Sequence, residues 1–382
     1  MKKAVIIASV ASMIDLFNME NIKILKSEGY EVDVVANFSN GSTTSKKRVD
    51  EFKVELESMG IKVFNLPIPR NIFNLIDIFS SLKELIEIMN VNNYSLMHCH
   101  SPIGGVVARL ASQLSKSKNR MATIYTAHGF HFFKGAPIVN WFIYYPVEKW
   151  LARYTDTLIT INKEDYSRAK RKFKAKRVEY VPGVGIDLKK FNSVEVDRYL
   201  KHKELGLPKG AFVVLSVGEL NKNKNHEVVI RAIAKIDNPD IHYIVCGEGQ
   251  LKGYLRDLSE ELGIKNRVHL LGFRNDIPEI CKIADLFAFP SYREGLSVAL
   301  MEAMANGLPA VCSNIRGNSD LIEDGKGGYL VEPGDVEGFT KCIKGLIEDS
   351  RLRSEFGDFN HKKIEHYSIE NVLKEMEEIY FD

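Results

Sequence analysis

Short runs of β-branched and apolar residues recur along the whole chain, and a helix-length amphipathic segment follows nearly every one. This alternation is typical of parallel βα units, in which helices cover the faces of a sheet. The expected strands are residues 3–10, 30–37, 61–67, 95–100, 122–128, 156–162 and 177–183, then 211–218, 242–249, 267–273, 284–291, 309–314 and 327–333. The chain therefore predicts an α/β protein of two doubly wound, Rossmann-like domains that face an interdomain cleft.

The length of 382 residues suits two such domains, since one domain usually takes roughly 150 residues. We expect the first domain over residues 1–185 and the second over 210–362. Between them, residues 186–209 are polar, punctuated by Gly and Pro, and are the expected linker. Residues 363–382 are expected to form a closing helix that crosses back to the first domain. Ligands of such sheets bind outside the carboxyl ends of the strands, so the cleft is the expected site.

The composition is that of a soluble globular protein, with 45% apolar residues and no run of 18 or more that could span a bilayer. The first residues, MKKAVIIASVASMID, have the basic and apolar character of a short signal peptide but lack a small-residue cleavage site. We interpret them as the first buried strand, with an export signal as the alternative. The five cysteines are scattered without a C-x-x-C motif, which favours a reducing cytoplasm over a disulfide framework or a zinc site.

The net charge of +2 conceals an asymmetry between the two halves. Residues 1–190 hold 28 Lys and Arg against 18 Asp and Glu, a balance of +10, whereas residues 191–382 hold 24 against 32, a balance of −8. Such asymmetry favours an anionic partner for the first half, a phosphate or a membrane surface. Ordinary variation between domains is the alternative.

Glu302 lies in the middle of an expected helix from Leu296 to Asn306, whose other residues are apolar on nearly every side. A helix of this kind is buried, and its carboxylate needs a hydrogen-bond donor or a cation because an unpaired buried charge is costly. The donor is either a structural neighbour or the vicinal hydroxyls of a ribose. The residues alone leave both open.

Glu294 lies three residues after the expected strand 284–291 and just before this helix, near a strand end where α/β proteins bind ligands. The turn EGLS, residues 294–297, offers N–H groups at the start of the helix, which suits a phosphate.

In the motif CGEGQ, Gly247 suits a tight turn where backbone approaches a ligand. In contrast, the first βα turn, SVASMIDLF, lacks the G-x-G-x-x-G of dinucleotide binding and argues against an oxidoreductase.

The spacing Glu294-x7-Glu302, within SYREGLSVALMEAMANGLPAV, resembles the signature of glycosyltransferase family 4, the group 1 glycosyl transferases with the GT-B fold. Further motifs follow in the family's order over nearly the full length: MHCHSP, TAHGFHF, YVPGVGID, SVGELNKNKNHE, VCGEGQ and LGFRNDIPEI. The resemblance favours glycosyltransferases of capsule and exopolysaccharide synthesis. It implies retaining transfer of a sugar from a nucleotide sugar, most simply UDP-linked, to a hydroxyl acceptor, with the donor in the second domain and the acceptor in the first.

The resemblance also implies residue roles in donor binding. Glu302 binds the ribose hydroxyls, and Glu294 lies beside the donor sugar. The N–H groups of Gly295, Leu296 and Ser297 lie near sugar hydroxyls and phosphate.

The motif NKNKNHE matches the family's phosphate-binding lysine at Lys224, where a cation stabilises the leaving diphosphate. Lys222 is a second candidate, or an exposed loop lysine. Many family members have an arginine where this chain has Glu219, so Lys224 carries more of the neutralisation or the donor is held differently. The base is expected at LGFRND, mainly through backbone groups of Phe273 and Arg274; a packed aromatic and a solvated charge are the alternatives.

His128 follows the strand 122–127 and precedes a glycine, which places it at a strand tip facing the cleft. The resemblance makes it a sugar-contacting or proton-handling residue; a core histidine is the alternative. His100 and His131 are weaker candidates, and His98 is expected to pack within its strand. No helical His-x-x-x-His or Asp-x-Asp motif accompanies them, so we expect neither a metal nor another cofactor, as the resemblance also implies.

The stretch 132–153 holds seven aromatic residues up to Trp150, interspersed with Lys134, Lys149 and Arg153. Rings and cations together suit a bilayer interface, to which residues 46–48 add basic side chains; an ordinary aromatic core helix is the alternative. We therefore expect a lipid-linked sugar diphosphate as acceptor, at the inner face of the cell membrane, and no nucleic acid. The rival functions are a hydrolysing UDP-sugar epimerase and a catalytically silent paralogue. The silent paralogue stays open because Glu219 stands where many family members have an arginine.

Overall fold

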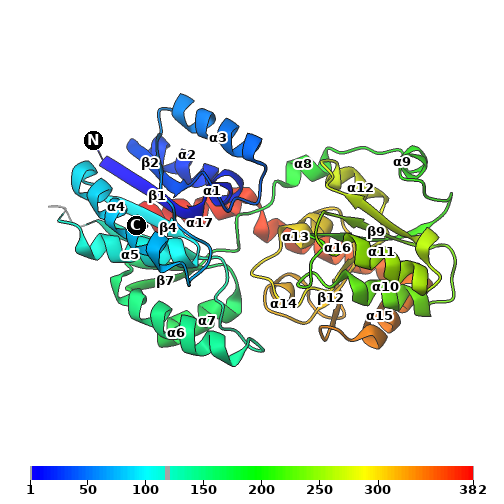
Figure 1. Ribbon diagram of the computed structural model, residues 1–382. Coiled ribbons are helices and arrows are strands. Elements are labelled where there is room, and N and C mark those ends of the chain that lie inside the picture. The colour runs from blue at the N-terminus through cyan, green and yellow to red at the C-terminus, as the bar shows by residue number, and fades with distance from the viewer. Residues whose placement is uncertain (1, 117–120, 382) are drawn as a thin grey trace. The chain divides into compact units, whose positions relative to one another are not determined.

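The computed structural model describes residues 2–116 and 121–381 (Figure 1). The chain forms two compact units. The first unit comprises residues 1–184 with 372–382, and the second comprises residues 185–371. Each unit is a parallel sheet with helices on both of its faces, as the alternation of strand and helix patterns predicts.

The first unit has a seven-stranded sheet in the order β3-β2-β1-β4-β5-β6-β7. Its strands are β1 Lys2–Val10, β2 Tyr30–Asn37, β3 Lys62–Asn65, β4 Leu96–His100, β5 Ala122–Ala127, β6 Thr157–Thr160 and β7 Arg177–Tyr180. Its helices are α1 Ala11–Phe17, α2 Met19–Ser27, α3 Lys46–Ser58, α4 Leu75–Asn92, α5 Pro102–Leu114, α6 Ile138–Leu151 and α7 Lys163–Lys172. Each of the seven expected strands is present.

The central strand β1 shows why the inner strands of the sheet are mostly apolar. Val5 and Ile7 pack into the core under α4, α5 and α6, while Ala4, Ile6 and Ala8 pack into the core on the opposite face. Successive side chains of a strand point to opposite faces, so a strand covered on both faces reads as a nearly continuous apolar run.

The C-terminal helix α17 Ile369–Phe381 contributes most of its length to the first unit, and Figure 1 shows it in red among blue and cyan elements. Val372, Met376 and Tyr380 recur every four residues on its buried face and join the core around β1 and β2. The hydroxyl of Ser368 accepts the N–H of Asn371 at 3.3 Å and caps the start of the helix.

The second unit has a six-stranded sheet in the order β10-β9-β8-β11-β12-β13. Its strands are β8 Phe212–Val217, β9 Ile241–Cys246, β10 Val268–Gly272, β11 Leu286–Phe289, β12 Ala310–Ser313 and β13 Gly328–Val331. Its helices are α8 Leu188–Asn192, α9 Arg198–Glu204, α10 His226–Lys235, α11 Lys252–Glu261, α12 Ile277–Ile283, α13 Val298–Ala305, α14 Asn318–Leu321, α15 Val336–Glu348 and α16 Ser350–Ile364.

Residues 186–209, where we expected a linker, carry α8 and α9 and lie within the second unit. Phe191, Leu205 and Leu207 from this segment are buried in the core beside α12 and α13. Three apolar side chains in a polar stretch are a weak sequence signal, so their packing became visible only in the structure.

None of the helices in residues 2–116 and 121–381 has the length and apolar character that crossing a membrane requires.

Candidate active site

The strand order of the second sheet reverses between β8 and β11, and such a reversal opens a crevice at the carboxyl ends of the two strands. The loop 218–225 leaves β8 and carries Lys224, while the loop 290–297 leaves β11 and carries Glu294. Lys224 Nζ lies 2.7 Å from Glu294 Oε1, and the two side chains are only 19% and 14% exposed. The fold thus brings together two site candidates that are 70 residues apart in sequence.

Two hydrogen bonds, one from a side chain and one between backbone groups, hold these two loops together. Asn223 Nδ2 donates to the carbonyl of Arg293 at 3.0 Å, and its own carbonyl accepts the N–H of Tyr292 at 2.8 Å. Lys224 Nζ also lies 4.7 Å from the ring centroid of Phe289, the last residue of β11. The position of the ammonium group is therefore fixed by both strands of the crevice, which suits a site that must present a charge without rearrangement.

Helix α13 begins beside this ion pair. Its start at Val298, two residues later than expected, follows from the cap at Ser297, whose hydroxyl accepts the N–H of Leu300 at 3.3 Å. The turn before the helix is backed by the segment after β12, where a Cβ on Gly317 would lie 2.2 Å from the carbonyl oxygen of Gly295. Only glycine fits there, so Gly317 permits the turn of residues 294–297 to take its shape.

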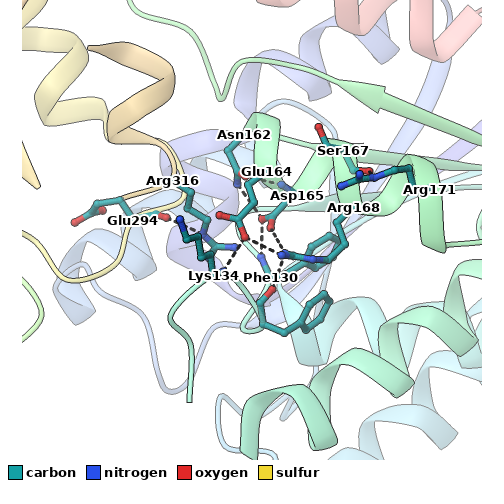
Figure 2. A network of polar contacts seen from close by, with 11 residues as sticks. Phe130, Lys134, Asn162, Glu164, Asp165, Ser167, Arg168, Arg171, Glu294 and Arg316 are labelled. Carbon is teal, nitrogen blue, oxygen red and sulfur yellow. Dashed lines mark hydrogen bonds and ion pairs between the residues drawn. The ribbon is translucent and has the colours of Figure 1, made fainter. Parts of the chain in front are cut away.

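Arg316, which is not among the residues predicted from the sequence, supports the same turn. Its Nε donates to the carbonyl oxygen of Glu294 at 3.2 Å, and Figure 2 shows the two residues side by side. The side chain is 7% exposed. A signal existed in the sequence: an arginine next to a glycine, directly after a buried strand, stands at the same sheet edge as the other site candidates.

Glu302 lies on α13, one and a half turns after its cap, and is mostly buried. Burial raises the pKa of its carboxyl group, and the charge of Lys190 opposes this rise. Among the described residues no side chain or N–H group hydrogen-bonds to the carboxylate. Among residues 2–116 and 121–381 the structural hypothesis therefore finds a nearby cation in Lys190 but no hydrogen-bond donor.

The candidates for the nucleobase site lie at the end of β10. The side chain of Phe273 is 76% exposed, so the alternative of a packed aromatic is wrong. Arg274 is not a free solvated charge either, because it bonds to Asp276 at 2.7 Å and Glu204 at 2.8 Å. Contact of a base with the backbone groups of Phe273 and Arg274 stays a prediction.

Gly247 packs against the backbone of the loop after β8. A Cβ at this position would lie 2.0 Å from the carbonyl oxygen of Gly218, because the loops after β8 and β9 cross in contact. The N–H of Leu220 donates to the carbonyl of Glu248 at 2.9 Å in the same crossing. Glu219 and Lys222 are exposed in the β8 loop.

The first sheet reverses its order between β1 and β4, and polar side chains gather there too. Ser9 Oγ lies 2.7 Å from Ser101 Oγ and accepts the N–H of Gly104 at 3.0 Å. His128 follows β5 directly, and its Nε2 lies 3.1 Å from Nδ1 of His100 at the end of β4. His98 is fully buried within β4, as expected for a residue that packs in its strand.

The segment after His128 is anchored by the start of α7, as Figure 2 shows. The carboxylate of Asp165 accepts the N–H of Phe130 at 2.9 Å and the side-chain amide of Asn162 at 2.9 Å. Glu164 accepts the N–H of Lys134 at 2.8 Å. An Asn-x-x-Asp start of a helix is visible in the sequence as a cap, but its role in holding a distant loop is not.

Burial lowers the pKa of His98 to about 3 and that of His128 to about 4, and it holds the pKa of His100 well below its usual value. These groups are neutral in the folded state but bind protons near pH 6.5 when unfolded. Acidification therefore favours the unfolded state: stability is complete above pH 6.5 and is lost as the pH falls towards 4. We expect the free energy of unfolding of the first unit to fall by up to about 1.4 kcal/mol per pH unit for each histidine. Chemical denaturation at pH 7, 6 and 5 measures this, and a constant free energy across that range would contradict it.

Comparison with known proteins identifies the family. Residues 197–363 match the family model described as "Glycosyl transferases group 1", and residues 7–162 match the model "Glycosyl transferase 4-like". EpsD of Bacillus subtilis (strain 168), named as a glycosyltransferase, is 35% identical over 383 residues, which cover 99% of this chain and 96% of EpsD. The chain belongs to the group 1 glycosyl transferases. The resemblance that rests on Glu294 and Glu302 is thereby confirmed.

A second relative of this glycosyltransferase is the UDP-Gal:alpha-D-GlcNAc-diphosphoundecaprenol alpha-1,3-galactosyltransferase of Escherichia coli. It is 28% identical over 373 residues, which cover 96% of this chain and 92% of the relative. The crystal structure of Anabaena Alr3699/HepE in complex with UDP matches with a TM-score of 0.78 at 21% identity, covering 100% of this chain and 99% of HepE. This likeness in fold, with the two parallel sheets, confirms the GT-B architecture.

Proposed function

We propose that this glycosyltransferase transfers a sugar, with retention of its anomeric configuration, from a UDP-linked donor to a hydroxyl of a lipid-linked saccharide in the synthesis of a bacterial surface polysaccharide. The ion pair of Lys224 and Glu294 at the reversal of the second sheet is the observation that carries the proposal. The names of the relatives support its substrates, since the E. coli enzyme takes UDP-galactose and a diphosphoundecaprenol-linked sugar.

In this proposal the site residues of the second unit bind different parts of the donor. Glu302 accepts hydrogen bonds from the ribose hydroxyls, which supply the donors that its buried carboxylate lacks. Glu294 accepts a hydrogen bond from a hydroxyl of the transferred sugar. The N–H groups of Gly295, Leu296 and Ser297 at the start of α13 bind sugar or phosphate oxygens.

The reaction exchanges one bond at the anomeric carbon for another. The acceptor oxygen attacks on the face that the diphosphate leaves, the bond from carbon to the diphosphate breaks, and the acceptor's proton passes to the leaving phosphate oxygen. Charge grows on the diphosphate during this step, and a fixed ammonium group at Lys224 stabilises that charge more than it stabilises the bound donor. His128 of the first unit is proposed to contact the transferred sugar.

Replacement of Lys224 tests the proposed catalytic role. We expect Lys224→Met to lower kcat/KM about a hundredfold, since removal of one donor from a developing anion has effects of this order. Lys224→Arg, which keeps a cation beside Glu294, should retain more activity than Lys224→Met. Lys222→Met is the matched control, because Lys222 is an exposed lysine of the same loop. Equal losses in Lys222→Met and Lys224→Met would contradict a specific role for Lys224.

The proposal places the lipid-linked acceptor near α6 of the first unit. Phe132 is buried, and Trp141, Tyr144 and Tyr145 pack against the core, so the core-helix alternative holds for one face of α6. On the other face Ile138 and Phe142 are 73% and 77% exposed. Exposed apolar side chains with basic neighbours such as Lys134 and Lys149 suit the boundary between lipid headgroups and acyl chains.

Arg48, expected to add to this basic surface, is engaged elsewhere. It binds Asp15 and Glu55, each at 2.6 Å. A cation held between two carboxylates has little charge left for an anionic lipid, so Arg48 has no place in the membrane proposal.

Binding to vesicles tests the membrane contact. Wild-type protein should co-sediment with vesicles of anionic lipid, less strongly at high salt, and the double variant Ile138→Ser, Phe142→Ser should bind at least about tenfold more weakly because two apolar anchors are lost. The double variant Tyr199→Ser, Leu200→Ser, which removes two exposed apolar side chains from α9 of the second unit, is the control. Absence of binding at every salt concentration, or equal losses in both variants, would refute the contact.

A further inference from the structure

Two histidines, His100 and His128, face each other at the ends of β4 and β5. His100 Nδ1 and His128 Nε2 lie 3.1 Å apart, which is hydrogen-bonding distance. Burial lowers the pKa of both groups, so both rings are neutral at physiological pH. In a pair of neutral imidazoles one nitrogen donates its proton and the other accepts with its lone pair. Which ring donates decides where His128 carries its own proton.

The surroundings of His100 distinguish the two arrangements. Its side chain is 1% exposed, and its second nitrogen, Nε2, is buried without a hydrogen-bonding partner among the described residues. If His128 were the donor, His100 would carry its proton on Nε2 and bury an unpaired N–H group. If His100 is the donor, only a lone pair is buried there. Unpaired N–H groups are the rarer of the two in protein interiors, so the geometry favours His100 as donor.

His98 holds the ring of His100 in place from the other side. The ring centroids of His98 and His100 are 4.1 Å apart. Both nitrogens of His98 are engaged, Nδ1 with the hydroxyl of Tyr380 at 2.6 Å and Nε2 with the hydroxyl of Thr126 at 2.8 Å. His98 therefore offers no competing partner, and His100 is left with His128 as its acceptor.

We infer that His100 donates its Nδ1 proton to Nε2 of His128 and thereby holds His128 in the Nδ1–H form, which presents a hydrogen-bond donor at the end of β5. His128 is half-buried, and no described residue hydrogen-bonds to its Nδ1. His128 then recognises an oxygen acceptor, a hydroxyl or a phosphate oxygen, and does not remove a proton as a base. His100 is a positioning residue that acts through His128. The assignment of this oxygen to the donor sugar rests on the proposed function, whereas the form of the ring does not.

Nitrogen-15 NMR of histidine-labelled, full-length protein measures the inference directly. Long-range correlations between ring protons and ring nitrogens distinguish a protonated from an unprotonated nitrogen, and the loss of signals in His128→Gln assigns His128. We expect wild-type His128 to carry its proton on Nδ1. His100→Leu should give a mixture of the two forms, while His100→Asn, whose side-chain amide can donate from the place of Nδ1, should keep the Nδ1–H form.

Two NMR outcomes would overturn the inference: His128 protonated on Nε2 in the wild type, or an unchanged form of His128 in His100→Leu. The wild-type and His100→Asn spectra decide the question even if His100→Leu does not fold. In sugar transfer, His100→Leu should lower kcat about tenfold, the equivalent of one hydrogen bond, and His100→Asn should restore it. If the NMR agrees but His128→Gln has full activity, the role of His128 in the proposed function fails and the inference on the proton stands.

Discussion

Replacement of Glu302 by leucine is expected to weaken the binding of UDP about a thousandfold and, at the same time, to stabilise the free protein. The loss of affinity follows from two hydrogen bonds between a carboxylate and the ribose hydroxyls, worth about 4 kcal/mol together. The gain in stability follows from the raised pKa of Glu302, which burial causes. Titration calorimetry with UDP and thermal unfolding of the same two proteins measure both effects.

The sign of the stability change follows from the direction of the pKa shift. A carboxyl group with a raised pKa in the folded state binds protons more tightly there than in the unfolded chain, so its ionisation at neutral pH opposes folding. Leucine has no charge to bury and suits the apolar neighbours of α13. Glu348→Leu, at an exposed position of α15, is the control and should leave UDP binding unchanged. If Glu302→Leu destabilised the protein and kept its affinity for UDP, Glu302 would have a structural partner.

The largest loss of stability is expected at Arg109, on α5 of the first unit. Arg109 and Glu148 are 1% and 6% exposed, and their side chains meet at 2.8 Å. Arg109 Nε also donates to the carbonyl of Gly105, and Tyr125 donates from its hydroxyl to Glu148 at 3.0 Å. Arg109→Leu leaves a buried carboxylate without its cation, so we expect the free energy of unfolding to fall by about 3–5 kcal/mol.

The double variant Arg109→Leu, Glu148→Leu is the control for this prediction. It removes both charges, and replacement of a whole buried pair by apolar side chains is close to neutral. Both tryptophans of the chain, Trp141 and Trp150, lie in the first unit, so urea unfolding followed by tryptophan fluorescence reports on that unit. A double variant as unstable as Arg109→Leu would show that packing, and not the unpaired charge, causes the loss.

Arg109 and Glu302 show what sequence reasoning could and could not determine. Both are charged residues within apolar helices, and for both the sequence demands a partner. Arg109 finds its partner in Glu148, 39 residues later, whereas Glu302 has no hydrogen-bonding partner among the described residues. The sequence of one helix predicts that a charged side chain is buried, but it does not predict which distant residue pairs with that charge.

The fold was predictable to a larger extent than the site. Strands covered on both faces are mostly apolar, so all thirteen could be located in the sequence. The contact between Lys224 and Glu294 depends on the adjacency of β8 and β11, which strand patterns do not encode. The contact of Arg316 with Glu294 and that of His100 with His128 depend on where side chains lie at the ends of different strands, and a linear sequence pattern does not show this.

The most direct test of the proposed function is a panel of UDP- and GDP-sugars incubated with a mixture of lipid-linked acceptors, with nucleotide release as the measured quantity. We predict that one UDP-sugar is consumed, that release depends on the acceptor, and that Glu302→Leu abolishes it. Binding of UDP without turnover of any donor would indicate a catalytically silent protein. If no UDP- or GDP-sugar is bound or consumed, the assignment of Glu302 to the ribose is contradicted and the proposed function falls with it; consumption of a GDP-sugar alone would contradict only the choice of UDP as the donor nucleotide.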